Sequence, residues 1–186
     1  MEFRRLDIPD VIVVLPRRFS DGRGWFAETW SAPSFAAAGI DVPFVQDNHT
    51  FSRQAGTVRA LHFQLPPHAQ AKLVRVAQGA IFDVALDLRR GSPSFGRFVT
   101  AKLTAEHGEE LFIPSGFAHG FATLKPDTEV IYKVSKPYAL AAERGLIWND
   151  PDLAIPWPVT GKAAILSEKD GKLPRFADFV SPFSFP

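Results

Sequence analysis

The sequence contains no cysteine, which excludes disulfide bonds, zinc–thiolate sites and cysteine nucleophiles. It also lacks a dominant charge, because 21 Lys and Arg are balanced by 20 Asp and Glu, so nothing indicates nucleic-acid binding. Long hydrophobic runs are missing too, since the early run over residues 11–15 is shorter than a signal-peptide core or a membrane-spanning helix. These absences predict a cytoplasmic protein with no nucleic-acid or membrane partner.

Several catalytic motifs are also missing. The segment Asp21-Gly22-Arg23-Gly24 indicates a turn rather than a phosphate-binding loop, and Ser115 lies in a Pro-Ser-Gly turn rather than a nucleophile elbow. A His-x-His metal pair is broken, because Gln64 stands two residues after His62. His119 is one possible ligand, but the other histidines lie on loop-like or edge segments, so no three-ligand site can be assembled. We therefore expect no metal and no other cofactor.

What is present is a series of short apolar or alternating runs separated by Gly and Pro, which predicts an all-β fold. The 186 residues suit one domain with a sizeable core, since 46% of them are hydrophobic. No domain boundary is visible, so we predict a single domain over residues 1–186. The expected strands cover residues 11–15, 25–30, 44–51, 57–64, 71–78, 80–88, 97–104, 110–114, 119–124 and 128–135.

Local signals add three further expectations. A short helix is predicted over 32–38, because Ser31 can cap it, Pro33 suits its first turn and Gly39 can end it. The Ala-Gln-Gly-Ala segment at 77–80 predicts a tight hairpin between two strands. From about residue 150 the chain is rich in Pro and aromatic residues, which indicates an irregular tail packed on a β-barrel.

Three ionisable side chains stand out on the predicted strands. His62 lies in mid-strand, where alternation places it on one face with Ala60 and Gln64, although a satisfied core histidine would look the same. Lys72 begins an apolar strand, a position where an edge or surface lysine is commoner. Tyr132 lies on another apolar strand and could serve only for packing.

Carboxylates and arginines supply further candidates. Asp170 ends a Ser-x-x-Asp spacing, which also suits a capping box. Asp83 and Asp87 share one face of a strand, which is compatible with a solvent-exposed face. Any phosphate would be held by arginines, with Arg23 and Arg59 as candidates, because guanidinium groups match phosphate oxygens.

Arg59 and His62 pose a geometric conflict. They are three residues apart, so a regular strand sends their side chains to opposite faces. Both can reach one ligand only if a bulge intervenes, or if Arg59 serves a site shared with a partner subunit.

Six fragments, in this order and at these separations, carry a family resemblance. They are QDNH at 46–49, RALHFQ at 59–64, KLVR at 72–75, IPSGFAHGF at 113–121, IWNDP at 147–151 and LSEKD at 166–170. Together they resemble the dTDP-4-dehydrorhamnose 3,5-epimerase family over about residues 3–170. The resemblance implies a metal-free, cupin-type jelly-roll β-barrel with short helices in its N-terminal arm and C-terminal tail. It also implies a homodimer in which the early strands cross to the partner.

The resemblance further implies a role for individual residues. His62 would be the general base, Tyr132 the general acid, Asp170 the partner of His62, and Lys72 the cation beside the keto oxygen of the sugar. Tyr138 would stack near the thymidine. The other positions implied to hold the dTDP-sugar are Arg23, Glu28, Gln46, Asp47, Asn48, Arg59, His119, Glu143 and Lys169, together with Lys72.

The predicted reaction is the inversion of C3 and C5 of dTDP-4-dehydro-6-deoxy-D-glucose, which gives dTDP-4-dehydro-L-rhamnose. The chain has Ala60 where the family commonly has Gly, and Phe63 where it commonly has Tyr. Neither change removes a proton carrier, but both leave the regiochemistry open. The alternatives are a mono-epimerase acting on C3 or C5, a ketoisomerase, or a non-catalytic cupin that binds a sugar nucleotide.

Overall fold

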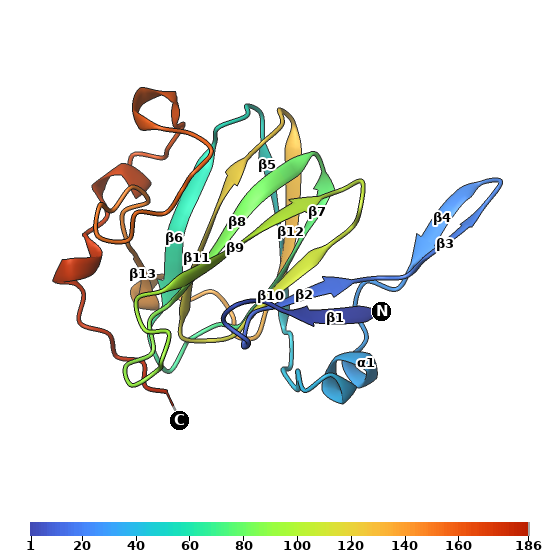
Figure 1. Ribbon diagram of the computed structural model, residues 1–186, viewed down its shortest axis with the longest axis horizontal. Coiled ribbons are helices and arrows are strands. Elements are labelled where there is room, and N and C mark those ends of the chain that lie inside the picture. Colours follow the sequence, from blue (N-terminus) through green and yellow to red (C-terminus); the bar gives the residue numbers. More distant parts are fainter. Residues whose placement is uncertain (186) are drawn as a thin grey trace.

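Two antiparallel β-sheets packed face to face form the body of the structure, a computed structural model that describes residues 1–185 (Figure 1). The six-stranded sheet contains, in spatial order, β1 (Glu2–Arg5), β2 (Ile12–Leu15), β10 (Glu110–Ile113), β7 (Lys72–Gln78), β12 (Thr128–Val134) and β5 (Gln46–Ser52). The five-stranded sheet contains β13 (Glu143–Gly145), β6 (Val58–Gln64), β11 (Phe117–Thr123), β8 (Ala80–Asp87) and β9 (Phe98–Thr104). The predicted all-β class is confirmed, although hydrogen bonding leaves two open sheets rather than a closed barrel.

The remaining elements flank the two sheets. A hairpin of β3 (Arg18–Asp21) and β4 (Gly24–Ala27) projects away from the body (Figure 1). The helix predicted over 32–38 is present as α1 (Ala32–Ala37), and Gly39 follows it with φ +83°. The tail contains short 3₁₀ helices, of which η3 (Asp170–Lys172) lies against β6. Each predicted strand is present within three residues of its expected ends, whereas the short β1, β3 and β13 were not predicted.

Apolar side chains form three layers. The layer between the sheets joins Val74 and Leu111 of one sheet to Ile81 and Phe121 of the other. A second layer packs the tail, through residues such as Trp148, Trp157 and Phe183, on the outer face of the five-stranded sheet. A third layer packs Phe35 of α1 on the outer face of the six-stranded sheet, against Ile12, Leu73 and Phe112. The tail therefore covers the outer face of the five-stranded sheet.

The predicted hairpin at 77–80 is wrong. Strand β7 pairs with β10 and β12, whereas β8 pairs with β11 and β9, so the chain crosses from one sheet to the other at Gly79. Gly79 has φ +84°, and a Cβ atom there would clash with the side chain of Thr128. The sequence predicts a turn that requires glycine. It does not show that the strands on the two sides of this turn belong to different sheets.

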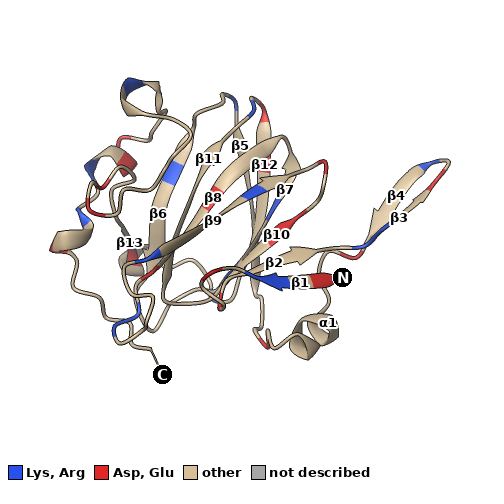
Figure 2. Cartoon of the chain, in the orientation of Figure 1, with Lys and Arg blue, Asp and Glu red and all other residues tan. Residues whose placement is uncertain are grey.

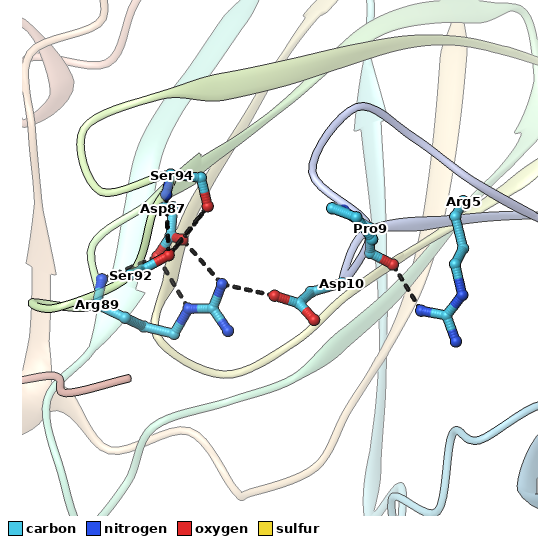
Figure 3. A network of polar contacts seen from close by, with 7 residues as sticks. All are labelled: Arg5, Pro9, Asp10, Asp87, Arg89, Ser92 and Ser94. Carbon is cyan, nitrogen blue, oxygen red and sulfur yellow. Dashed lines mark hydrogen bonds and ion pairs between the residues drawn. The ribbon is translucent and has the colours of Figure 1, made fainter. Parts of the chain in front are cut away.

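Asp83 and Asp87 do not lie on a solvent-exposed face, because both side chains are fully buried. Asp87 accepts hydrogen bonds from Arg89, Ser92 and Ser94, and Arg89 also donates to Asp10 near the N-terminus (Figure 3). This network ties the loop after β8 to the turn that follows β1. The buried charge of Asp87 is thus compensated by a structural network, as buried charges require.

Basic and acidic segments are interspersed over both sheets and the tail (Figure 2). This distribution matches the near-zero net charge of the sequence. Within residues 1–185, no helix is long and apolar enough to cross a membrane.

Candidate active site

A cavity of about 630 Å³ opens between the two sheets. Its walls come from β5, β6, β7, β11, β12 and β13 and from tail residues 165–170. Most of the residues that the resemblance implicated share this wall: Gln46, Asn48, Arg59, His62, Lys72, His119, Tyr132, Tyr138, Glu143, Lys169 and Asp170. The fold thus collects into one space residues that are spread over 125 positions of the chain, from 46 to 170.

A β-bulge in β6 brings Arg59 and His62 to the same side. His62 lies opposite His119 of β11, and Arg59 lies opposite Phe121, so β6 takes three steps where β11 takes two. The extra residue in β6 shifts the alternation of its side chains. Arg59 and His62 therefore both line the cavity, whereas Ala60, expected on the face of His62, packs in the core on the other side.

His62 and Asp170 form a hydrogen-bonded pair at the cavity wall. The Nε2 atom of His62 lies 2.8 Å from Oδ1 of Asp170, and Asp170 is buried. Burial raises the pKa of Asp170, but hydrogen bonds from His62 and Ser167 outweigh it and bring the pKa below its usual value. Because the carboxylate stays charged, Nε2 is the protonated nitrogen. In residues 1–185 no hydrogen bond engages Nδ1, which leaves that atom able to accept a proton.

Lys72 is a buried lysine, and the alternative of a surface or edge position is wrong. It is 8% exposed, and its Nζ atom lies 3.4 Å from the backbone oxygen of His62. Burial lowers its pKa from 10.5 to about 8, and the negative charges of Asp83 and Glu143 limit the decrease. The ammonium group therefore remains the main form at neutral pH. Because it is buried, its charge is screened less by water than that of a surface lysine.

Tyr132 faces the cavity from β12, next to Lys72 in the alternation of the six-stranded sheet. It pairs with Val74 of β7, two residues beyond Lys72. Burial raises the pKa of Tyr132, Arg59 opposes this change, and Glu143 adds to it. The phenol is consequently neutral over the physiological range and can donate a proton. Its position in the cavity wall favours a chemical role over packing alone.

His119 is held by a carboxylate that the sequence did not mark as functional. Its Nε2 atom lies 2.6 Å from Oδ1 of Asp83, and both side chains are buried. Burial lowers the pKa of His119, while the adjacent Asp83 opposes the decrease. The only sequence signal for Asp83 was its place in an apolar strand, and that signal also suited a solvent-exposed face.

The rim of the cavity is a connected polar cluster. Gln46 donates to Asn48 over 2.8 Å and accepts a hydrogen bond from the backbone N–H of Tyr138. The Tyr138 hydroxyl donates to Glu143 over 2.7 Å, and Lys169 lies 2.5 Å from the same carboxylate. Tyr138 lines the cavity and is 54% exposed, so it lies at the mouth, where a ligand can contact it.

Three implicated residues do not reach this cavity. Asp47 lies on the opposite face of β5, where it pairs with Lys133. Arg23 is in the turn of the β3–β4 hairpin with its side chain 92% exposed, and Glu28 follows the same hairpin. The hairpin projects away from the two sheets (Figure 1), and the cavity lining found in residues 1–185 includes none of its residues.

The arrangement places the His62–Asp170 pair, the phenol of Tyr132 and the ammonium group of Lys72 around one space. Groups of these kinds are able to move protons next to a carbonyl group. Among residues 1–185, no group of three or more His, Asp or Glu side chains is placed to hold a metal ion.

Comparisons with known proteins show the family to which the chain belongs. The family model described as dTDP-4-dehydrorhamnose 3,5-epimerase matches residues 5–178. The enzyme of that name from Sinorhizobium fredii is 48% identical over 185 residues, covering 100% of this chain and 94% of the relative. The one from Pseudomonas aeruginosa is 49% identical, covering 96% of this chain and 97% of the relative.

A solved structure extends the likeness to three dimensions. The dTDP-6-deoxy-D-glucose-3,5-epimerase of Legionella pneumophila, in complex with dTDP-4-keto-L-rhamnose, superimposes with a TM-score of 0.94 at 36% identity. The match covers 100% of this chain and 98% of that one. This chain is an enzyme of the isomerase type and belongs to the dTDP-4-dehydrorhamnose 3,5-epimerase family.

Proposed function

We propose that the cavity between the sheets is the active site and that His62, Tyr132 and Lys72 carry out the reaction there. The reaction inverts C3 and C5 of dTDP-4-dehydro-6-deoxy-D-glucose and gives dTDP-4-dehydro-L-rhamnose. The observation that carries the assignment is that the His62–Asp170 pair, Lys72 and Tyr132 line a single cavity. A mere binding protein has no need of paired proton carriers in one wall.

The chemistry of the substrate explains why a buried cation is needed. The hydrogens at C3 and C5 both flank the C4 carbonyl, so removal of either proton gives an enolate with negative charge on O4. A cation placed at O4 stabilises that transition state more than the neutral ketone. Lys72 suits this role, because it is buried yet has a pKa of about 8 and stays charged at neutral pH.

The base and the acid must act from opposite faces of the sugar ring for a carbon to be inverted. His62 is assigned as the base, because Asp170 orients its ring and stabilises the imidazolium that forms when Nδ1 takes the proton. Tyr132 is assigned as the acid, because it is a neutral phenol on β12, in the sheet that faces β6. After Tyr132 has donated its proton, the positive charge of Arg59 stabilises the phenolate that remains.

The nucleotide half of the substrate suits the rim of the cavity. Arg59 and Lys169 supply positive charge for the diphosphate, and Gln46 and Asn48 supply hydrogen-bonding groups. The exposed ring of Tyr138 is assigned to stacking on the thymine base. Glu143 orients this group through its contacts with Tyr138 and Lys169.

The homodimer is proposed on the properties of the β3–β4 hairpin. It carries Phe19, Trp25 and Phe26, which are 52%, 58% and 69% exposed, on an arm that contacts little of its own chain. Exposed aromatic residues at this density are typical of an interaction surface. An arm inserted at the partner's cavity would also deliver Arg23 and Glu28 to a dTDP-sugar. The cytoplasmic location stays a prediction from the sequence.

The test of the proposed function is proton exchange in deuterated water. The enzyme is incubated with dTDP-4-dehydro-6-deoxy-D-glucose, the ketone is trapped by reduction, and NMR locates deuterium and configuration. Deuterium with inversion at both C3 and C5 is expected. Inversion at one carbon would identify a mono-epimerase instead, and a folded protein that exchanges neither proton would contradict the assignment.

A further inference from the structure

Asp83 is a buried carboxylate directly behind the cavity wall. Its side chain is fully buried on β8, and its Oδ1 atom lies 2.6 Å from His119 Nε2 and accepts a hydrogen bond of 2.9 Å from the N–H of Val84. Its Oδ2 atom is buried with no hydrogen-bond partner in residues 1–185. A carboxylate with an unpaired buried oxygen is unfavourable for stability, so its presence next to the site calls for a functional reason.

The first consequence of this geometry concerns His119. It lies directly opposite His62 in the pairing of β11 with β6, and each of these histidines places Nε2 on an aspartate. Burial lowers the pKa of His119 and favours the neutral ring, whose Nε2–H donates its hydrogen bond to the Asp83 carboxylate. Its Nδ1 atom is then an acceptor, suited to a sugar hydroxyl rather than to phosphate.

The second consequence concerns Lys72. Of the charges that raise the pKa of Lys72 against burial, Asp83 acts most strongly and Glu143 comes second. No direct ion pair joins Lys72 to Asp83 in the described residues, so Asp83 acts on Lys72 through space. The side-chain hydrogen bond found for Lys72 within residues 1–185 goes to the backbone oxygen of His62, which leaves other ammonium hydrogens for O4. The other ionisable groups around the same cavity are Arg59 and His62 on β6, His119 on β11, Tyr132 on β12, Tyr138 after β12, Glu143 on β13, and Lys169 and Asp170 in the tail.

We propose that Asp83 is a positioning residue of the epimerisation, which fixes the tautomer of His119 and keeps Lys72 in its charged form without contacting the substrate. This inference rests on the proposed roles of Lys72 and His119 in the cavity. It explains why a fully buried acid is placed on β8 against His119, a residue of the cavity wall.

The test compares Asp83→Asn with Asp87→Asn, two isosteric changes at buried aspartates of the same strand face. Asp83→Asn is expected to lower kcat by about 10- to 100-fold, as loss of an outer carboxylate partner does at metal sites. The variant should also move the alkaline limb of the pH profile of kcat to lower pH. The reason is that the negative charge of Asp83, which raises the pKa of Lys72 most strongly, is lost. Asp87→Asn, which disturbs only the Arg89 network, should lower the melting temperature and leave that limb in place.

A folded Asp83→Asn enzyme with the wild-type kcat and the wild-type alkaline limb would overturn the inference. Should that variant not fold, the wild-type enzyme still decides, because ¹⁵N NMR of its imidazoles reports the tautomer of His119. A proton on Nε2 is expected, and a neutral ring protonated on Nδ1 would overturn the inference. Failure of the proposed function itself is distinguished by a wild-type enzyme that exchanges no deuterium into the substrate.

Discussion

His62 and Asp170 are 108 residues apart in the sequence, yet their side chains meet at a distance of 2.8 Å. His62 lies on the bulged strand β6, and Asp170 begins the short 3₁₀ helix η3 in the tail. The backbone N–H of Asp170 also donates to Ser167, so the Ser-x-x-Asp spacing gives a local turn as well as a partner for His62. The tail thus completes a site whose other walls are strands.

Replacing Asp170 with Asn should impair the chemical step far more than substrate binding. The amide cannot stabilise the imidazolium and can favour the wrong tautomer of His62, so kcat is expected to fall by about 10²- to 10⁴-fold. Steady-state kinetics with the dTDP-sugar measure kcat and KM separately. Glu168→Gln is the matched control, because that carboxylate is 85% exposed in the same segment and should leave kcat unchanged. An Asp170→Asn enzyme with nearly full kcat would show that the pair with Asp170 does not assist His62 in the reaction.

Replacing Lys72 with Met should make the protein inactive and more stable at once. Loss of the charge at O4 is expected to lower kcat by at least about 10²-fold. The charged form of Lys72 is disfavoured in the fold, since its pKa falls from 10.5 to about 8. The decrease already includes the attraction of Asp83 and Glu143. Because Met carries no charge to bury, the unfolding free energy of Lys72→Met at pH 7 is expected to exceed that of the wild type by roughly 3 kcal/mol.

Urea denaturation and kinetics on the same preparation test both halves of this prediction. The exposed Lys102 on β9 supplies the control, since Lys102→Met should change neither quantity measurably. A Lys72→Met protein that is less stable than the wild type would show that the lysine serves the fold rather than the reaction.

Glu110 should make stability decrease as the pH rises. It is 1% exposed on the outer face of the six-stranded sheet, and neither of its carboxylate oxygens has a hydrogen-bond partner in the described part of the chain. Burial raises its pKa from 4.5 to about 8, although Arg75 and Lys133 oppose the increase. Between these two values the folded state holds a proton that the unfolded state releases, so the unfolding free energy falls as pH rises from 4.5 to about 8.

Glu110→Gln should remove this component of the pH dependence and stabilise the protein most at pH 8 and above. Urea denaturation of the wild type and the variant at several pH values gives the difference between their unfolding free energies. Contributions from groups that titrate alike in both proteins cancel in this difference. Glu106 is exposed, so Glu106→Gln serves as the control. Its unfolding free energy should change with pH in the same way as that of the wild type. A difference that stays constant from pH 5 to pH 8.5 would mean that Glu110 is ionised in the fold with a partner.

The strands and most of the cavity residues could be predicted because their signals are local. Apolar runs bounded by Gly and Pro mark a strand whatever it pairs with, and the fragments around His62, Lys72 and Asp170 keep their spacing in the sequence. The strand β13, which carries Glu143 into the site, is only three residues long and forms because β6 offers it an edge. Its own residues contain no pattern that predicts a strand.

What could not be predicted depends on which strands meet. The bulge that unites Arg59 and His62 exists only relative to β11, so the alternation of β6 alone gives the wrong face for Arg59. The turn at Gly79 was recognised, but the crossing between sheets is a property of β7 and β8 together. The fully buried Asp83 is identical in sequence pattern to an exposed acid, because its partner His119 lies 36 residues away.

The arm that carries Arg23 allows a test of shared sites by complementation. If each arm serves the partner's cavity, Arg23→Ala damages the partner's site, whereas His62→Asn damages a subunit's own site. Each variant alone should then have low activity. Co-expression of the two should restore activity in mixed dimers, since the cavity of the Arg23→Ala subunit receives an intact arm. With random pairing about one quarter of all sites are intact.

The control pair is His62→Asn with Tyr132→Phe, because both changes lie in the wall of the subunit's own cavity. Mixed dimers of that pair contain no intact site and should show no gain over the separate variants. Two outcomes would contradict the shared site. An Arg23→Ala enzyme with the KM and kcat of the wild type would show that Arg23 of the arm contributes to neither subunit's site. A damaged Arg23→Ala enzyme that co-expression with His62→Asn fails to rescue would mean that Arg23 serves its own subunit.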